Sequence, residues 1–462
     1  MNAWKILLAV CVAGVLPMVA MAQQPAEIAK VTEGAVGALA RIEFKIENEL
    51  VGSQRQIGQA VCIDAAQGIF ITRDIPATFL PEEMKEFKLA TANSGEDKFD
   101  AEFLGLEPVR NIAFLKAKGG KWTALKFEDK ANVQIGQTVM SVGLLGPGAG
   151  NVLYTGLAHV GAKLRLPQDL VYVTGGDLTN ASSPVFTTDG KVIGLVGGEI
   201  PMEFRMAAGG QWADVLLVGV QRMRFFIPAD DFASLLKEVP SKDKPFRLPW
   251  LGVVNFEAVS KETEDLWKLN TPAVLLGRIV ENSPAAKAGL QQGDAIVGLN
   301  GQPLEKMPTA GLVVAQFDRQ LARMKSGQEI SLTYVRKGEK KDVKVTLEPM
   351  PQRAFEAQKF VNKNLGFALR DLVPGDRYSR PQPLKEDGVV VIGVAPNSPA
   401  ATGSLKPEDI ITRINDKQVK KVADLKTMME DLEKNAKKAP ITFMVIRGDQ
   451  TVPVVVTPVQ QP

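Results

Sequence analysis

Histidine and cysteine are scarce in this chain of 462 residues, which contains one histidine and two cysteines. Zinc sites draw mainly on these two side chains, and His159 lies far along the chain from Cys62. The glycine-rich stretch Gly146–Gly150 lacks the lysine and the Ser or Thr that a phosphate-binding loop requires. The sequence therefore predicts no metal centre and no bound cofactor.

An excess of one charge is also absent. Lys and Arg number 55 and Asp and Glu 52, the net charge is +3, and the two signs are interspersed. Nucleic-acid-binding proteins gather basic residues on one face or stripe, so we expect no DNA or RNA partner. The chain has 45% hydrophobic and 23% charged residues, as soluble globular proteins do. Its length exceeds what one hydrophobic core supports, so several domains are expected.

One long apolar run lies at the N-terminus. Lys5 precedes an apolar stretch over Ile6–Val19, and the small residues Ala20 and Ala22 flank Met21. This is the layout of a secretory signal peptide over residues 1–22, and the run is short for the ~20 residues of a membrane span. We therefore predict a periplasmic or secreted protein with no transmembrane segment after cleavage. Cleavage would leave Cys62 as the sole cysteine and exclude an internal disulfide.

The second half of the chain contains an internal repeat. NSPAAKAGLQQGDAIVGLNGQPL begins at Asn282, NSPAATGSLKPEDIITRINDKQV begins at Asn397, and the two align without gaps. Each copy combines short strands with helices and closes on an alternating hairpin. The spacing between the copies is too long for the unit of a solenoid. We therefore predict two copies of one β-rich domain, over residues 249–351 and 352–462.

Residues 23–240 have a different pattern. Short alternating stretches such as LARIEFKI, NIAFLKA and KVIGLVGG recur with turn signals between them, which predicts an all-β barrel or sandwich. Residues 229–239, ADDFASLLKEV, have the spacing of an amphipathic helix that would close this domain. Prolines and charges in the following PSKDKPFRLP indicate a linker, which we place at residues 241–248.

Each repeat carries an x-Φ-Gly-Φ motif ahead of a strand, Trp250-Leu251-Gly252-Val253 in the first copy and Asn364-Leu365-Gly366-Phe367 in the second. On this motif the two copies resemble PDZ domains, in which it forms the carboxylate-binding loop. Glycine permits a turn whose backbone N–H groups converge on a carboxylate, while the ligand adds a strand to the sheet edge. The alternative is that one copy only packs against the other domains. The resemblance implies two peptide-carboxylate sites, formed by Leu251, Gly252, Val253, Leu365, Gly366 and Phe367.

The chain resembles the HtrA (DegP-type) serine protease family over nearly all of its predicted mature length. GLEPVRNIAFLKA resembles the family's strand with the catalytic aspartate, and QAVCIDAAQGIFITRDIPA resembles the hairpin that leads to the catalytic histidine. IGQTVMSVGLLGPG resembles a glycine-rich segment of the same domain. The resemblance implies a mainly β chain, with a trypsin-like double β-barrel followed by two PDZ domains. It also suggests a homo-trimer, because family members commonly form trimers.

The catalytic triad of the family is replaced at all three aligned positions. Ile75 stands at the histidine, Asn111 at the aspartate and Ala181 at the serine. A serine without a base is a weak nucleophile, and loss of the serine or the histidine alone lowers turnover by about 10⁶ in a well-studied protease. We therefore predict a degenerate triad with no catalytic residues.

Other sources of nucleophilic chemistry are limited to the same loop. Ser182 and Ser183 replace two glycines of the family's G-N-S-G-G-P motif, and Thr179 replaces its first glycine, which shapes the oxyanion loop. The single histidine, His159, precedes Ala181 on a predicted strand of the domain's second half, whereas the family's base lies in the first half. Lysines are too numerous to exclude a Ser–Lys pair by counting, but no motif positions one.

These observations predict an exported HtrA-like pseudoprotease that binds extended or C-terminal peptide segments of envelope proteins, as a scaffold, adaptor or chaperone. One alternative is an active HtrA-type serine endoprotease in protein quality control that acts through Ser182 or Ser183. Another is a regulatory subunit that forms hetero-oligomers with an active homologue.

Overall fold

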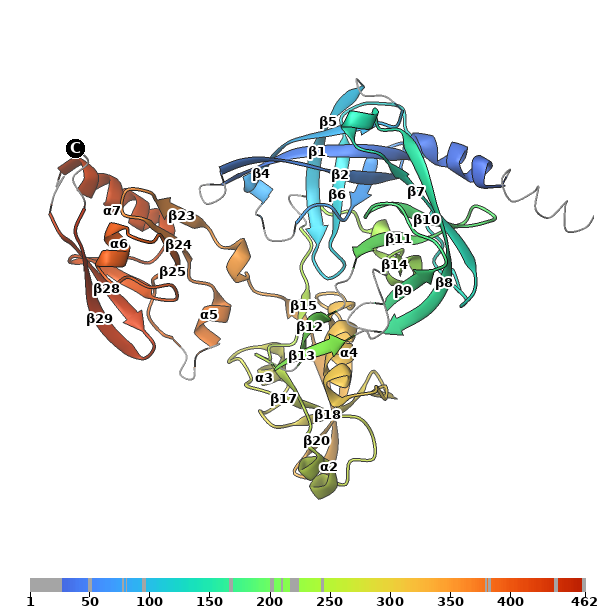
Figure 1. Ribbon diagram of the computed structural model, residues 1–462. Helices are drawn as coiled ribbons and strands as arrows, with labels where there is room; N and C mark the ends of the chain where they lie inside the picture. Colours follow the sequence, from blue (N-terminus) through green and yellow to red (C-terminus); the bar gives the residue numbers. More distant parts are fainter. Residues whose placement is uncertain are drawn as a thin grey trace, which may run out of the picture.

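The computed structural model describes residues 27–48, 52–76, 79, 81–93, 97–165, 169–199, 203–208, 211–216, 224–241, 245–378, 380, 384–435 and 439–458. The predicted signal peptide lies outside these residues. The chain forms a pair of closed barrels followed by two smaller sheet domains, which we call the first and second repeat domains (Figure 1). In the described part of the chain, no helix is both long and apolar enough to cross a membrane.

The first barrel follows a helix at residues 27–35 and has the strand order β1-β2-β3-β6-β5-β4. Alternation in LARIEFKI places Ile42, Phe44 and Ile46 in its core, as the sequence pattern predicts. The elements are η1 (Val36–Ala38), β1 (Leu39–Asn48), β2 (Gly52–Asp64), β3 (Ile69–Thr72), η2 (Pro81–Glu83), β4 (Met84–Thr91), β5 (Lys98–Glu107) and β6 (Ile112–Ala117).

The second barrel has the order β10-β11-β14-β9-β8-β7. One hydrophobic cluster contains residues of both barrels, including Phe114 from the first and Tyr172 from the second, so the two barrels pack against each other. The elements are β7 (Thr138–Leu144), η3 (Pro147–Ala149), β8 (Leu153–Arg165), β9 (Asp169–Thr174), β10 (Pro184–Thr187), β11 (Val192–Glu199) and β14 (Arg224–Pro228), with β12 (Glu203–Ala208) and β13 (Gln211–Leu216) as a separate hairpin.

The prediction of an amphipathic helix over residues 229–239 is wrong. The segment forms two short 3-10 turns, η4 (Ala229–Asp231) and η5 (Leu235–Lys237). An α-helix would use the carbonyl of Asp231 as the acceptor for the N–H of Leu235, but Arg110 Nε donates to that carbonyl at 2.7 Å. Leu235 N–H donates to the carbonyl of Phe232 instead, at 2.9 Å. A side chain remote in sequence thus ends the helix after one turn.

The first repeat domain is a sheet in the order β16-β17-β18-β20-β21, with β19 paired to β18. Strand β16 lies at the edge of this sheet, and α4 packs against it. The elements are β15 (Pro249–Trp250), β16 (Phe256–Ala258), α2 (Lys261–Trp267), β17 (Val274–Leu276), α3 (Pro284–Lys287), β18 (Ala295–Leu299), β19 (Gln302–Pro303), α4 (Ala310–Ala322), β20 (Glu329–Arg336), β21 (Glu339–Thr346) and β22 (Glu348–Pro349).

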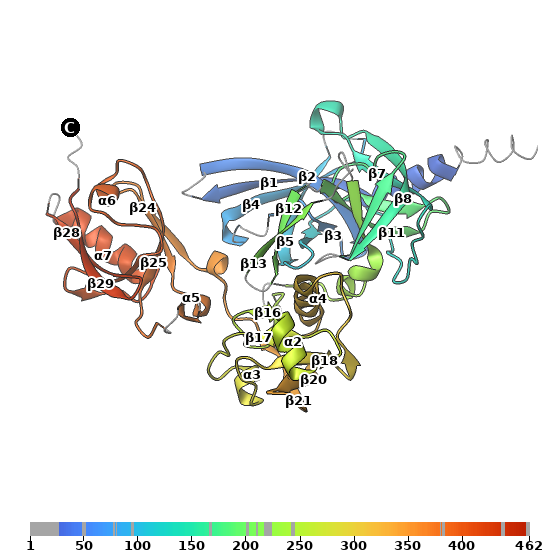
Figure 2. The same ribbon diagram turned by 60° about the horizontal axis from the view of Figure 1, so that its bottom comes forward.

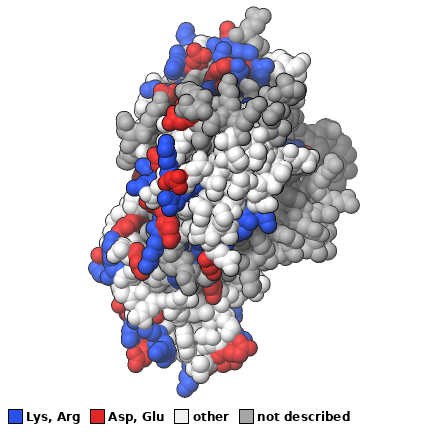
Figure 3. Space-filling view, turned by 90° about the vertical axis from the view of Figure 1, so that its left-hand side faces the viewer, with Lys and Arg blue, Asp and Glu red and all other residues white. Residues whose placement is uncertain are grey.

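The second repeat domain has the order β23-β24-β25-β26-β28-β29, with β27 paired to β26. It lies to one side of the barrels and contacts the first barrel through Lys359 and Glu83, whereas the first repeat domain lies beneath the barrels (Figures 1 and 2). On the face viewed in Figure 3, acidic and basic side chains are intermixed. The elements are η6 (Ala354–Glu356), β23 (Lys359–Asn362), β24 (Phe367–Asp371), α5 (Pro374–Tyr378), β25 (Val389–Val394), α6 (Pro399–Thr402), β26 (Ile410–Ile414), β27 (Lys417–Gln418), α7 (Val422–Asn435), β28 (Ile441–Arg447) and β29 (Gln450–Val456).

Candidate functional site

The loops that carry the three degenerate triad positions meet around Arg73, between the barrels. Asn111 precedes β6 and donates its side-chain N–H to the carbonyl of Arg73 at 2.8 Å. The N–H of Arg73 donates to Ser182 Oγ at 2.9 Å, next to Ala181. Ile75 follows β3 and is fully buried in the core of the first barrel. The segments that carry Asn111 and Ala181 thus meet at Arg73, two residues before Ile75, and the side chains of Ile75, Asn111 and Ala181 offer no nucleophile or base.

The hydroxyls of Ser182 and Ser183 are enclosed. Both residues are 0% exposed. Besides accepting from Arg73, Ser182 Oγ lies 3.4 Å from Thr72 Oγ1, and Ser183 Oγ accepts from Gln59 Nε2 at 3.1 Å. Ser182 also adopts a left-handed φ of 64°, a conformation that suits the glycine it replaces. Both hydroxyls are thus buried and already accept hydrogen bonds from within the protein.

The amide of Thr179 also has an internal acceptor. Its N–H donates to Ser141 Oγ at 2.8 Å, and its own hydroxyl donates to the same oxygen at 3.0 Å. Thr179 is fully buried. An oxyanion hole needs N–H groups aimed at the position of the developing charge. The N–H at this position of the loop points to a serine hydroxyl of the same barrel instead.

One acid lies in this cluster, and the sequence argument missed it. Asp74 accepts the N–H of Gln59 at 2.7 Å, and burial raises the pKa of its carboxyl to about 6. A Cβ on Gly58 would lie 2.6 Å from Asp74 Oδ2, so the glycine leaves room for the carboxylate. Asp74 directly precedes the position aligned with the histidine, but nothing in the sequence distinguishes it from an exposed acid.

The scarce histidine and cysteine lie outside this cluster. His159 is exposed on β8, with Nδ1 3.1 Å from Thr138 Oγ1 on the neighbouring strand. Cys62 is fully buried in β2, and burial raises the pKa of its thiol to about 11. Within the described ranges, no three His, Cys, Asp or Glu side chains gather as a metal site would require.

The first repeat domain forms the predicted loop at Leu251, Gly252 and Val253. Gly252 has a φ of 92°, and a Cβ there would lie 2.1 Å from the Cβ of Ser283. The N–H of Val254 donates to the carbonyl of Arg278, and that of Val280 donates to the carbonyl of Gly252, both at 2.9 Å. Val253 is therefore the non-hydrogen-bonded residue of its bridge with Ile279. Its own N–H and C=O point to the opposite side, where a further strand can add.

The second repeat domain builds its loop from equivalent residues. Gly366 has a φ of 75°, and a Cβ there would lie 2.2 Å from the Cβ of Ser398. Its N–H, however, donates to the carbonyl of Asn362 at 2.8 Å. The N–H of Leu365 donates to Asn362 Oδ1 at 2.9 Å. Two oxygens of one buried residue thus occupy two of the amides expected to hold a carboxylate.

The segment before this loop lies where a peptide would bind. Strand β23 pairs antiparallel with β24, from Lys359 opposite Arg370 to Asn362 opposite Phe367. It also contacts α7. A peptide ligand of such a domain adds as a strand beside the strand that follows the loop. In the second repeat domain this position is filled by the chain itself, whereas in the first it is the free edge of β16.

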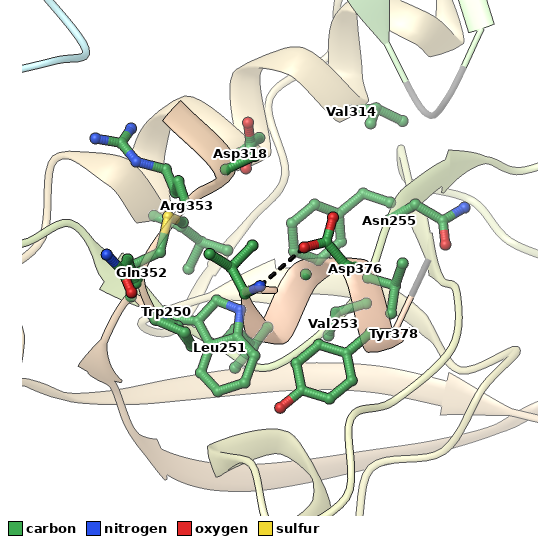
Figure 4. A pocket seen from close by; sticks show the side chains of 18 of the residues that line it. Trp250, Leu251, Val253, Asn255, Val314, Asp318, Gln352, Arg353, Asp376 and Tyr378 are labelled. Atoms are coloured by element: carbon green, nitrogen blue, oxygen red, sulfur yellow. Dashed lines mark hydrogen bonds between the residues drawn. The ribbon is translucent and has the colours of Figure 1, made fainter. Parts of the chain in front are cut away.

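A cavity of about 590 Å³ lies between the first loop, the region of β16 and α4 (Figure 4). Leu251, Val253 and Phe256 line one side, and Val314, Asp318 and Leu321 of α4 line the other. Apolar side chains thus surround a space next to the outward-facing backbone of Val253. The predicted residues of the first site therefore border a groove.

Comparison with known proteins matches both halves of the chain. The model of the trypsin-like peptidase domain matches residues 60–195, and that of the PDZ domain matches residues 254–347 and 364–457. The repeat domains are PDZ domains.

Curated relatives and solved structures agree with this architecture. A "Probable periplasmic serine endoprotease DegP-like" of Pseudomonas putida is 28% identical over 366 residues, 74% of this chain and 68% of the relative. A relative of the same description from Bartonella henselae is 28% identical over 365 residues, 76% of this chain and 66% of the relative. The solved structure "HtrA-type protease AlgW with decapeptide" has a similar fold, with a TM-score of 0.51 at 18% identity, over 70% of this chain and 99% of its own. With its double barrel and two PDZ domains, the chain belongs to the HtrA (DegP-type) family.

Proposed function

We propose that this protein is a pseudoprotease of the HtrA family that binds extended or C-terminal peptide segments of envelope proteins through its first PDZ domain. The observation that carries the proposal is a contrast between two loops. The barrel loop has Ala181 at the serine position, its hydroxyls at Ser182 and Ser183 are buried, and its Thr179 amide has an internal acceptor. The loop of Leu251, Gly252 and Val253 borders a cavity and a free sheet edge.

The absence of proteolysis follows from the chemistry of the barrel site. Cleavage of an amide in this fold requires a hydroxyl, a base that takes its proton and donors for the oxyanion. Ile75 cannot accept a proton. Ser182 and Ser183 are fully buried and already accept hydrogen bonds from Arg73 and Gln59. An accessible hydroxyl, a base and a free oxyanion donor at Thr179 are therefore all missing from this arrangement.

Peptide binding is supported by the edge strand and by the relatives. Addition of a peptide strand beside β16 would satisfy main-chain groups that lie at the sheet edge, while apolar pockets read alternate side chains. AlgW, an HtrA-type protease of similar fold, has been solved with a tripeptide and with a decapeptide. The DegP-like relatives are described as periplasmic, and the predicted signal peptide agrees with that compartment. Envelope proteins are therefore the expected source of ligands.

The test combines a binding and a cleavage assay on the full mature chain. Fluorescence anisotropy with C-terminal decapeptides is expected to show binding that is lost when the terminal carboxylate is amidated. Casein is expected to remain intact, and a fluorophosphonate probe is expected not to label the protein. Cleavage that stops in Ser182→Ala or Ser183→Ala would instead establish the active protease.

A further inference from the structure

The peptide groove of the first PDZ domain is completed by residues from outside that domain (Figure 4). The 590 Å³ cavity beside Leu251 and Val253 continues past the end of β22. Its remaining wall comes from the last residues of the first PDZ domain, and from the first residues and the α5 region of the second. These residues are Met350, Pro351, Gln352, Arg353, Ala354, Val373, Gly375, Asp376 and Tyr378.

Two contacts hold the second domain at the carboxylate end of the groove. The ring of Tyr378 stacks on Trp250, with centroids 6.5 Å apart and an interplanar angle of 20°. Trp250 is the first residue of the carboxylate-loop motif. The guanidinium of Arg278 donates to the main-chain carbonyls of Tyr378 and Arg380. Because Arg278 also pairs with Val254 through its own carbonyl, the wall is tied directly to the strand that would receive the ligand.

Two of the charged residues that line the cavity form ion pairs within the protein. Asp376 pairs with Arg370 at 2.6 Å. Arg353 pairs with Glu356 at 2.9 Å, and its guanidinium lies over the ring of Phe355.

Asp318 is the remaining charge of the lining, and in the described part of the chain no ion pair or hydrogen bond links it to a partner. Its side chain projects from α4 toward the cavity (Figure 4). Asp318 is accessible to solvent, and partial desolvation by the surrounding groups raises the pKa of its carboxyl above the ordinary value.

We propose that this composite pocket selects C-terminal peptides that carry a Lys or Arg side chain close to an apolar terminal residue, with Asp318 as the partner of the basic group. The inference rests on the proposed function. In a strand added beside β16, alternate side chains point to the same face. The terminal side chain would lie among Leu251, Val253 and Leu321. The next side chain on that face, two residues earlier, is the one within reach of α4.

The first experiment measures the charge preference directly. Anisotropy titrations use decapeptides that are identical except for Lys, Gln or Glu at the second residue before the terminus. The full chain is expected to bind the Lys peptide at least about 10-fold more tightly than the Glu peptide. Asp318→Asn is expected to reduce this ratio to within about twofold, and Asp318→Lys to reverse it. Glu281→Gln, an exposed acid of the same domain outside the cavity, is the matched control and should leave the ratio unchanged.

The second experiment tests the wall contributed by the second PDZ domain. Tyr378→Ala is expected to weaken all three peptides by a similar factor of about 3–10 and to leave the Lys-to-Glu ratio unchanged. Unaltered affinity in this variant would remove the second domain from the site.

The outcomes separate this inference from the proposed function. If peptides bind with a free carboxylate but Asp318→Asn leaves the ratio unchanged, peptide binding stands and the charge selection is wrong. If no peptide binds the folded chain, the proposed function itself fails.

Discussion

In the first PDZ domain the strand that follows the carboxylate loop, β16, is the edge of its sheet, whereas in the second the equivalent strand, β24, is flanked by β23. The loops themselves are closely similar. In each, a left-handed glycine lies against the serine that caps a short helix, Ser283 of α3 or Ser398 of α6. The repeated motif therefore determines the shape of the loop, while the segment before it determines whether the amides are free. Asn362 takes the amides in the second domain.

The same difference separates the first PDZ domain from the barrel. In the barrel loop the N–H of Thr179 already donates to Ser141, as the N–H groups of Leu365 and Gly366 donate to Asn362. In both the barrel loop and the loop of the second PDZ domain, backbone amides thus have internal acceptors. An amide with a good internal acceptor gains little from a ligand, because binding only exchanges one hydrogen bond for another.

The clearest way to break the comparison is to disable each loop in turn. Gly252→Glu is expected to lower peptide affinity at least about 100-fold, because the new Cβ overlaps Ser283 and adds a carboxylate where the ligand's would lie. Gly366→Glu is expected to leave the affinity of the full chain within about twofold. Gly301→Glu, at a left-handed glycine with no heavy atom within 4 Å, controls for backbone strain. Anisotropy gives the affinities, and loss of binding only in Gly366→Glu would reverse the assignment of the two domains.

If β23 is what closes the second groove, displacing β23 should open a peptide site there. Asp371 N–H donates to the carbonyl of Gln358, so Phe360 and Leu369 form the next, hydrogen-bonded pair of the β23–β24 ladder. Phe360→Pro removes the ladder N–H, and Asn362→Ala removes the acceptor of the Leu365 amide.

When Phe360→Pro and Asn362→Ala are combined with Gly252→Glu, which abolishes peptide binding by the first domain, we expect peptide binding to return through the second domain. The affinity should fall within about tenfold of the original site. Val361→Ala, in the same strand, is the control and should remain silent. A silent double variant with an intact fold by circular dichroism would show that β23 is not what closes this groove.

The two PDZ domains also differ in how they are anchored to the barrels. Arg319 of α4 is buried and forms a bidentate pair with Asp169, at 3.2 and 2.6 Å, and it lies 3.5 Å from the buried Asp231. Arg323 also pairs with Asp231. The second domain pairs with the first barrel through Lys359 and Glu83, at 3.5 Å.

Removal of the first anchor should cost more than removal of the second. Arg319→Ala removes a buried guanidinium and leaves Arg323 as the remaining partner of Asp169, so it is expected to lower the free energy of unfolding by about 2–3 kcal/mol. Lys359→Ala is expected to lower it by about 1 kcal/mol or less. Differential scanning calorimetry of the full chain compares the two, and equal losses would show that both domains are held with similar strength.

The sequence predicted the repeat and the two glycine loops, because each motif is a short contiguous stretch of the chain. The degenerate triad depends on the alignment of three distant segments and stays a prediction. Gly252, for example, follows from the x-Φ-Gly-Φ motif alone, whereas its contact with Ser283 was seen only in the structure. What the sequence did not predict depends on partners far along the chain. Arg110 ends the helix at residue 231, and Asp74 joins Ser182 and Gln59 across two barrels. The pairing of β23 with β24 was also not predicted, because no turn motif in the sequence distinguishes the segment before the loop from an ordinary linker.

The smallest expected effect is a pH dependence of the free energy of unfolding that comes from Asp74 near the barrel loop and has no equivalent in the second PDZ loop. The native pKa of Asp74 is about 6, above its ordinary value of 3.8. The native state then binds the proton more tightly than the unfolded state, so stability falls as pH rises from about 4 to 6 and stays lower above that. Asp74→Asn is expected to raise the free energy of unfolding by about 1–2 kcal/mol at pH 8, with no gain near pH 4. Urea denaturation at both pH values measures this difference, and an equal gain at both would assign the effect to packing. The second PDZ loop should have no counterpart, because Asn362 cannot titrate.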